Sequence, residues 1–512
     1  MNTFMNNLTD NTNFTFTENG AITHKTTRSD LLDLFAMGAA YRSRSEADVI
    51  NLFKNAYVEN PTYALKCLFY IRDIRGGQGE RRFFRTCMRW MAMVHPTVVF
   101  NLLEYVPEFG RWDDMYTFVN TPCEKEAFQV MKKQFALDLE CKTPSLLAKW
   151  LKSENTSSKE SRRYATLTRQ YFHMTSRQYR KTLSILRQRI NVLERLMSEN
   201  RWDEIEFDKI PSKAGMMYKN AFARHDIERQ KNANVVSYAD FSKDETTTVN
   251  AKALYPYECV REAIKVAKNQ RWDHFGEFEE VNRAMINKYW DNLTDYFNNS
   301  TFNGIAVVDT SGSMTMNYRG ASATPIDVAI SLGLYCAEHN SGPFANHYIS
   351  FASRPQLIRT DGIDFCDKVE RIYQTNLIDN TNIEAVFDLL LKVALQPSTK
   401  KQDIPQNVII ISDMEFDSAV DNWRERNGVN SDNVETLLES IAKKWSRCGL
   451  DLPGLIFWNV NARQDNIPII GNGRISYVSG FSPIIFETIM SGKTGYELMM
   501  EKLNSERYEC IK

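Results

Sequence analysis

The sequence has no paired cysteine pattern and few histidines. Its nine cysteines are odd in number and scattered without any C-x-x-C spacing, and its 7 histidines form no metal-hydrolase motif. Paired cysteine spacings are typical of zinc sites and of disulfide-rich secreted domains. We therefore expect neither kind of site, and we expect a reducing, cytoplasmic location.

Long apolar runs are also absent. No stretch approaches the roughly 18 apolar residues that a membrane span requires, and the first 29 residues are rich in Asn and Thr, unlike a secretion signal. We expect no membrane span. At 512 residues, 43% of them hydrophobic, the chain can bury more than one core. Nothing in the sequence indicates an oligomeric state.

The formal net charge is only −1, so the overall balance does not indicate a partner. The distribution is more informative. Residues 142–231 contain 20 Lys and Arg against 10 Asp and Glu, a local excess of +10. A nearly neutral chain therefore contains a basic central region, which is typical of proteins that bind acidic partners.

Two kinds of apolar pattern divide the chain. After an irregular lead-in over residues 1–28, apolar residues recur at helical spacing through 29–300, and alternating strand patterns are scarce. From 301 to 512, short apolar runs alternate with helical patterns, which is typical of a doubly wound, mostly parallel sheet. We predict the class α plus α/β, with an all-α region of stacked helical hairpins followed by a Rossmann-like α/β domain.

One strand of the predicted sheet is followed by three oxygen-bearing side chains. Residues 305–308 form a buried apolar run, and Asp309, Ser311 and Ser313 follow at alternate positions. Hard divalent cations such as Mg²⁺ take oxygen ligands, and ligands of α/β sheets bind outside the carboxyl ends of strands. The pattern predicts a cation site. The alternative is that these residues only cap and turn the junction between strand and helix.

The pattern Asp-x-Ser-Gly-Ser resembles the metal-ion-dependent adhesion site (MIDAS) of von Willebrand factor A (vWA) domains. The resemblance implies two further ligands on other loops of the same sheet edge. Thr381, just before a helical series, and Asp413, after the buried run 408–412, match them in order; Thr375 is the weaker alternative to Thr381. The implied ion is Mg²⁺, or Mn²⁺ or Ca²⁺, with an open position that a partner's carboxylate fills.

The loop after the apolar run 408–412 departs from the vWA pattern. Met414 stands where many vWA domains have a glycine, and Glu415 and Asp417 follow it closely. These carboxylates are near enough in sequence to crowd or supplement the ion. A degenerate site that keeps the fold without metal is therefore a further alternative. No general base or nucleophile is evident beside the site, so we expect a binding protein and not an enzyme.

Basic residues gather in the helical region. The run from Arg72 to Arg82 combines a Gly-Gly-Gln-Gly turn with four arginines, and residues 159–189 interleave Arg and Lys with Tyr and Phe. Basic grooves bind phosphates, and aromatic faces stack on unpaired bases. The alternative is solvated helix faces with the aromatic side chains in the core. The predicted nucleic-acid contacts are Arg72, Arg75, Arg81, Arg82, Arg162, Arg163, Arg169, Arg177, Arg180, Lys181, Lys213, Lys219 and Arg224.

Three helical motifs extend the resemblance beyond the cation loop. They are the run 72–81 (RDIRGGQGER), the run 110–114 (GRWDD) and the run 211–214 (PSKA). With the Asp-x-Ser-x-Ser loop, this layout resembles the Ro autoantigen-type (TROVE) RNA-binding proteins. It is more similar still to a phage, giant-virus and plant family of unknown function.

The resemblance to Ro-type proteins implies HEAT-like helical repeats in a ring that the vWA domain closes. It also implies structured RNA on a basic outer surface and single-stranded RNA ends in the hole. The expected function is RNA binding, in quality control or in a ribonucleoprotein. The alternative is an interaction scaffold whose vWA site binds an acidic protein partner without nucleic acid.

Overall fold

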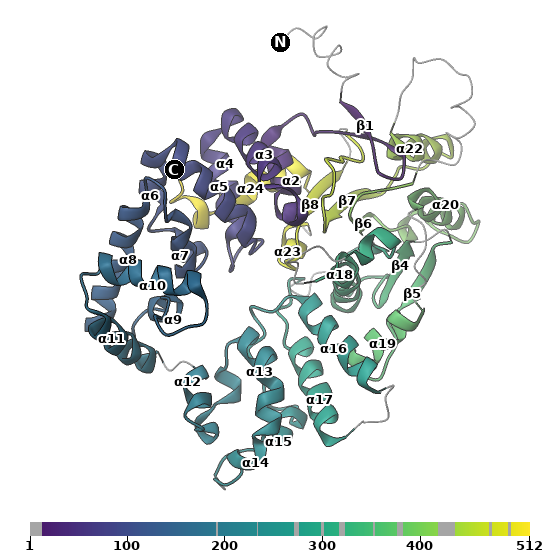
Figure 1. Ribbon diagram of the computed structural model, residues 1–512. Helices are drawn as coiled ribbons and strands as arrows, with labels where there is room; N and C mark the ends of the chain where they lie inside the picture. Colours follow the sequence, from purple (N-terminus) through teal and green to yellow (C-terminus); the bar gives the residue numbers. More distant parts are fainter. Residues whose placement is uncertain are drawn as a thin grey trace.

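The computed structural model describes residues 13–512 except 191–192, 233, 271–275, 298–301, 317–322, 352–353, 376–381, 418–435, 471–473 and 490–492. A helical region precedes an α/β region with a mostly parallel sheet, which confirms the predicted class. Figure 1 shows the helices as an arc whose two ends both lie against the α/β region. In the described part, no helix has the length and hydropathy to cross a membrane.

The first half of the arc consists of short helices, several of which begin at side-chain caps. Ser45 forms a capping box with Asp48 at the start of α3, and Asn60 ends α3 and caps α4, whose first residue is Pro61. The elements are α2 (Asp30–Met37), η1 (Gly38–Ser43), α3 (Glu46–Glu59), α4 (Pro61–Arg72), α5 (Arg81–Val94), α6 (Pro96–Leu102), α7 (Val106–Phe109), η2 (Trp112–Phe118), α8 (Glu124–Glu140), α9 (Leu147–Trp150), α10 (Lys159–Tyr171) and α11 (Ser176–Arg189).

The second half of the arc packs around its last helix. Helices α13, α15 and α16 all contact α17. The pattern over 176–196 predicts one helix, whereas the structure has α11 ending at Arg189 and α12 beginning at Leu193. The elements are α12 (Leu193–Ser198), η3 (Trp202–Glu204), η4 (Phe207–Lys209), α13 (Ser212–Arg224), α14 (Asp226–Arg229), α15 (Tyr238–Lys243), α16 (Pro256–Gln270) and α17 (Glu277–Asp291).

The α/β region contains a sheet of order β5-β4-β3-β6-β7-β8, parallel except for the edge strand β5. The five parallel strands are formed by short, mostly buried runs, two of which are the predicted runs 305–308 and 408–412, whereas β5 is largely exposed. The elements are β3 (Gly304–Asp309), η5 (Gly312–Thr315), α18 (Pro325–His339), β4 (His347–Phe351), β5 (Gln356–Arg359), α19 (Phe365–Thr375), α20 (Ile383–Ala394), η6 (Lys401–Asp403), β6 (Asn407–Ser412), α22 (Leu437–Arg447), β7 (Gly454–Asn459), β8 (Ile475–Ser479), α23 (Ile485–Ile489), α24 (Gly495–Leu503) and η7 (Glu506–Tyr508).

The residues before α2 are more ordered than the predicted irregular lead-in. Strands β1 (Phe14–Phe16) and β2 (Ile22–His24) form an antiparallel hairpin. His24 exchanges backbone hydrogen bonds with Ile467 of the α/β region in both directions. The prediction of an irregular lead-in is therefore wrong for these residues, because the hairpin gains its partners from a segment more than 400 residues away.

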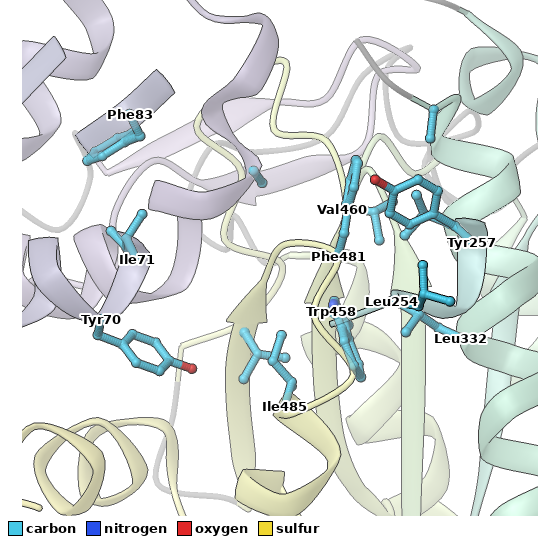
Figure 2. Close-up of a cluster of buried hydrophobic side chains, with 14 of the residues drawn as sticks. Tyr70, Ile71, Phe83, Leu254, Tyr257, Leu332, Trp458, Val460, Phe481 and Ile485 are labelled. Atoms are coloured by element: carbon cyan, nitrogen blue, oxygen red, sulfur yellow. The ribbon is translucent and has the colours of Figure 1, made fainter. Parts of the chain in front are cut away.

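Both ends of the helical arc contact the α/β region. Helices α2 and α4 pack against β8 and α24, and α16 and α17 pack against α18 and α19. Figure 2 shows Tyr70 and Tyr257 on opposite sides of Trp458 and Phe481. The Phe481 ring lies 5.4 Å from the Tyr257 ring and 3.5 Å from the Arg42 guanidinium. The two ends thus share one apolar cluster, in which each buried aromatic contributes on the order of 2–3 kcal/mol.

Candidate cation and nucleic-acid sites

Three neighbouring strands end at the same level of the sheet. Val308 is in register with Ile411, and Ser412 with Asn459, so Asp309 and Ser412 lie at the carboxyl ends of adjacent parallel strands. The structure thereby brings the loops that carry Asp309, Ser311, Ser313 and Asp413 together at one edge. Thr381 lies outside the described residues, as does the side chain of Thr375.

Hydrogen bonds fix the Asp309 carboxylate inside this edge. Its Oδ1 accepts from the Ser311 amide at 2.9 Å, and its Oδ2 accepts from the Ser412 hydroxyl at 2.5 Å. The hydroxyl oxygens of Ser311 and Ser313 are 3.1 Å apart. Asp309, Ser311 and Asp413 are all buried. The loop is therefore built around a carboxylate with hydroxyls beside it.

The electrostatics of the edge favour a cation. Burial and the neighbouring Asp413 carboxylate raise the pKa of Asp309 to about 7. Burial also raises the pKa of Asp413, although the Arg463 guanidinium opposes this shift. Oxygen ligands of this type suit Mg²⁺, which would offset the repulsion between two buried carboxylates. No three His, Cys, Asp or Glu side chains of the described part form a metal cluster, so the hydroxyls would have to contribute.

The residues after Asp413 have structural roles that the sequence did not indicate. Met414 is buried with a φ of +66°, the left-handed conformation that a glycine adopts more easily. Glu415 is turned to the β1–β2 hairpin: its Oε2 accepts from the Glu18 amide at 2.7 Å, and its Oε1 accepts from Asn466 at 2.9 Å. Asp417 forms a β-bridge with Gly20. Glu415 therefore anchors the hairpin.

Sequence reasoning missed Ser412 and Arg463 at this edge. Ser412 is the last residue of β6 and bonds Asp309, whereas Arg463 follows β7 and lies 3.1 Å from Asp413. Parallel strands of one sheet end at the same edge. The polar residues after the apolar run 454–458 could therefore have indicated that Arg463 lies near Asp413.

The glycine-rich motif of residues 72–82 has an internal role. The Arg72 side chain is 2% exposed, and its Nε and Nη2 donate to the same oxygen of Asp114 at 2.9 and 2.7 Å. Arg85 donates to the other Asp114 oxygen at 2.6 Å. Arg72 is therefore a correction to the predicted nucleic-acid surface, because its guanidinium is buried in an ion pair.

The same motif joins distant parts of the chain. Asp73 accepts hydrogen bonds from both Arg507 and, at 3.0 Å, the Tyr508 hydroxyl. Gly79 has a φ of +66°, and a Cβ there would lie 2.1 Å from the Tyr255 hydroxyl. The Tyr255 hydroxyl donates to the Gln78 carbonyl at 3.3 Å. The turn is thus the place where the two ends of the arc and residues 507–508 meet.

The other arginines of the motif differ in how free their side chains are to contact a ligand. Arg75 and Arg82 are exposed, but Arg75 donates to the Glu108 carbonyl and Arg82 donates to the carbonyls of Tyr41, Arg42 and Arg44. Arg81 is exposed and forms no ion pair with a described carboxylate. In this motif, Arg81 is thus the predicted contact with the most freedom to meet a ligand.

The basic charge of the central region is concentrated in helices α9 to α11. Residues 142–189 contain 12 Lys and Arg against 2 Asp and Glu, whereas residues 190–231 contain 8 of each. Glu154 is bonded by Arg169 at 2.9 Å and by Ser176 at 2.5 Å, and Glu160 accepts from Tyr164. The whole excess of +10 therefore belongs to one short segment, which contains six of the predicted contacts.

Most of these six side chains are free of acidic partners. Arg169 is half-buried in its pair with Glu154, and Arg180 lies 4.0 Å from the same carboxylate. The other four are exposed and form no ion pair with a described carboxylate: Arg162, Arg163, Arg177 and Lys181. Arg162 donates to carbonyls and Arg163 to the Asn120 side chain, so both keep their charge available. We call these four residues the α10–α11 basic surface.

The aromatic residues among these charges belong to the core. Tyr164 stacks on Tyr116 at 4.9 Å, and Tyr171 stacks on Phe128 at 4.4 Å. Phe172 and Tyr179 are buried. Phe172 and Tyr179 are thus withdrawn from the surface, whereas Tyr164 and Tyr171 are half-buried, each with one ring face already stacked on a core ring.

The remaining predicted contacts lie on α13. Lys219 is buried and bonds Glu262, which removes it from the surface and corrects its assignment. Lys213 pairs with Glu258 at 3.2 Å and lies over the Tyr255 ring. Arg224 is exposed and donates to its own helix at Asn220. Only Arg224 is thus exposed and free of acidic partners among the described residues of this group.

Comparisons with known proteins cover nearly the whole chain. Residues 17–163 and 142–301 match the model of "Domain of unknown function (DUF2828)", and residues 303–510 match "Domain of unknown function (DUF7788)". The chain is 30% identical over 520 residues to "Uncharacterized protein L728" of Acanthamoeba polyphaga mimivirus, covering 94% of this chain and 85% of that protein.

A solved structure also matches over most of the chain. It is the crystal structure of the Deinococcus radiodurans RO (RSR) protein, at 12% sequence identity and a TM-score of 0.39. The match covers 91% of this chain and 100% of that one.

Proposed function

The chain belongs to the DUF2828 family, and we propose that it is an RNA-binding protein of Ro type whose helical arc binds RNA. The observation that carries the proposal is the α10–α11 basic surface, in a segment with 12 basic and 2 acidic residues. Unneutralised Arg and Lys release counterions from a phosphate backbone when they bind it. The resemblance of residues 72–81, 110–114 and 211–214 to motifs of Ro-type proteins supports the same ligand class.

The ligand of this surface is structured RNA in preference to a single strand. Recognition of unpaired bases relies on aromatic faces, whereas A-form helices are bound through phosphates and 2′-hydroxyls. Tyr164 and Tyr171 are stacked on core rings, and Phe172 and Tyr179 are buried. The surface therefore offers charge with few free ring faces, which suits the backbone of a duplex.

Fluorescence anisotropy with the full chain tests the proposal. The ligands are an RNA duplex, a single-stranded RNA and a DNA duplex of equal length, each titrated at several salt concentrations between roughly 50 and 300 mM. We expect the RNA duplex to bind most tightly, with an affinity that falls steeply with salt. RNA binding that is absent or insensitive to salt would refute the proposal.

Charge reversal locates the binding surface. Arg177→Glu with Lys181→Glu should weaken RNA-duplex binding by at least about tenfold and reduce the salt slope by about two. The matched control is Lys400→Glu with Lys401→Glu, the same charge change on an exposed turn of the α/β region. Equal losses in both double variants would mean that net charge, and not this surface, drives binding.

The strand-end cluster supports a second role, as a vWA-type cation site. Asp309, Ser311, Ser313 and Asp413 would hold a divalent cation such as Mg²⁺, and the ion would supply an open coordination position for an acidic partner. The donor set and the raised pKa of Asp309 support this assignment. The α/β region would then both close the arc of helices and recruit that partner.

The two roles can be separated by one substitution. Asp309→Ala should abolish capture of an acidic protein partner from the native cell while RNA affinity is unchanged. Capture that persists in Asp309→Ala, or RNA affinity that is lost with it, would contradict this division. Without RNA binding in any variant, the chain would be an interaction scaffold.

A further inference from the structure

The β1–β2 hairpin lies along the loop that carries Asp413. The Glu18 amide donates to the Glu415 carboxylate, Asn19 donates to the Glu415 carbonyl at 2.6 Å, and the Thr17 hydroxyl donates to the Phe416 carbonyl at 2.6 Å. The hairpin also pairs with Ile467 in the loop after β7. Two of the three strand-end loops are therefore bonded to it.

Arg463 links the hairpin to the candidate cation site. Its Nη1 bonds the Glu18 carboxylate, and its Nη2 lies 3.1 Å from Asp413 Oδ2. The Arg463 side chain is 12% exposed, and the Asp413 side chain is 0% exposed. A guanidinium charge thus already stands beside a carboxylate that the cation site requires.

The two oxygens of Asp413 are bound differently. Oδ1 accepts from the Glu415 amide at 3.3 Å. Oδ2 accepts no hydrogen bond from any described residue, although it is buried. Its contact with Arg463 is an ion pair without an aligned hydrogen bond. Oδ2 is therefore the oxygen that a hard cation could take over with the least loss of existing bonds.

We propose that Arg463 and a divalent cation compete for Asp413, so that cation binding displaces Arg463 and loosens the β1–β2 hairpin. This inference rests on the proposed cation site and adds its regulation. A guanidinium and a divalent ion cannot both contact Oδ2, because their charges repel in a buried setting. When Arg463 leaves, Glu18 loses this ion pair, and the hairpin keeps its hydrogen bonds to residues 415–416 and 467 and the contact of His24 with Glu439.

The competition predicts a measurable change in cation affinity. If Arg463 occupies Asp413 in roughly 90% of molecules, the apparent Kd of the cation is about tenfold weaker than the intrinsic one. Removing the guanidinium removes that factor. Arg463→Met should therefore bind Mn²⁺ at least about tenfold more tightly than the native chain.

Titration calorimetry of the full chain with Mn²⁺ alone tests this. Asp309→Asn should abolish binding in the native and the Arg463→Met backgrounds, which places the ion at the strand ends. Arg177→Met is the matched control, an arginine lost from a distant surface, and should leave the affinity unchanged. Arg463→Gln replaces Arg463→Met if the latter does not fold.

Hydrogen exchange supplies the second readout. Mn²⁺ should increase amide exchange over residues 14–24 of the native chain and have little effect in Arg463→Met, whose hairpin is already loosened. An affinity for Mn²⁺ that is unchanged or weaker in Arg463→Met, or a hairpin that Mn²⁺ protects, would overturn the competition while leaving the cation site intact. Absence of Mn²⁺ binding in every variant would remove the cation site itself, and RNA affinity would report independently on the helical surface.

Discussion

Two arginine-rich segments of the helical region differ in how their charged side chains are bonded. In the run from Arg72 to Arg82, most charges are bound internally, to Asp114 or to carbonyl groups. In α10 and α11, Arg162, Arg163, Arg177 and Lys181 remain exposed without described acidic partners. The difference lies in the neighbours: Asp113, Asp114 and Glu108 lie beside the first segment, and few acids lie beside the second. A count of arginines therefore indicates a nucleic-acid surface only where carboxylates are scarce.

The largest expected effect on stability is that of Arg72→Met, which tests this contrast. The substitution leaves the Asp114 carboxylate buried with one of its two arginine partners, and breaking a buried pair in this way costs about 3–5 kcal/mol. We expect a lower free energy of unfolding by about that amount in urea denaturation. RNA affinity per folded molecule should stay unchanged, and a loss of affinity would place Arg72 at the RNA surface after all.

The next largest loss of stability should come from Gly79→Ala. The residue has a φ of +66°, and the added Cβ would meet the Tyr255 hydroxyl at 2.1 Å. Strain of this kind costs on the order of 1–3 kcal/mol, measurable as a fall in Tm. Tyr255→Phe in the same chain removes the clashing oxygen and should restore part of the loss. No restoration would mean that backbone strain alone accounts for the effect.

A smaller effect is expected for Tyr508→Phe. The hydroxyl donates to Asp73 at 3.0 Å, and Asp73 keeps its bonds from Arg507. Loss of one hydrogen bond costs about 1 kcal/mol, to be measured by urea denaturation. Tyr496→Phe, at an exposed tyrosine of α24, is the control and should have no effect. A loss similar to that of Arg72→Met would contradict this assignment of one hydrogen bond to the hydroxyl, which also lies 3.4 Å from the Gly76 carbonyl.

The smallest change in stability should come from Arg177→Met with Lys181→Met. Both side chains are exposed, so the free energy of unfolding should change by no more than about 0.5 kcal/mol. RNA-duplex affinity should nevertheless fall several-fold, because the two phosphate contacts proposed for these side chains would be lost. Destabilisation without a loss of affinity would reverse the roles assigned to the two segments.

Local patterns predicted the α/β region well. Strand β6 and helix α18 follow from an apolar run and from the sequence Thr324-Pro325, which forms a capping box with Asp327. The convergence of Asp309 and Asp413 follows from the geometry of parallel strands, which is local information repeated along one edge.

Local sequence patterns do not reveal which residues pair when they are distant in sequence. Arg72 and Lys219 have the composition of surface residues, and only the fold shows that Asp114 and Glu262 neutralise them. The two strands of the β1–β2 hairpin have only three residues each, too few for alternation to indicate a strand, and the hairpin depends on Glu415 and Ile467. In each case the partner is too distant in sequence for periodicity to reveal it.

The hydrogen bond between Asp73 and Tyr508 has a consequence for how the chain folds during its synthesis. These residues are 435 positions apart, and a ribosome adds about 5–20 residues per second. Asp73 therefore waits on the order of 20–90 seconds before its partner emerges. Through that interval the glycine-rich turn is without the side chains that complete it, so this junction is among the last parts of the chain to take its final form.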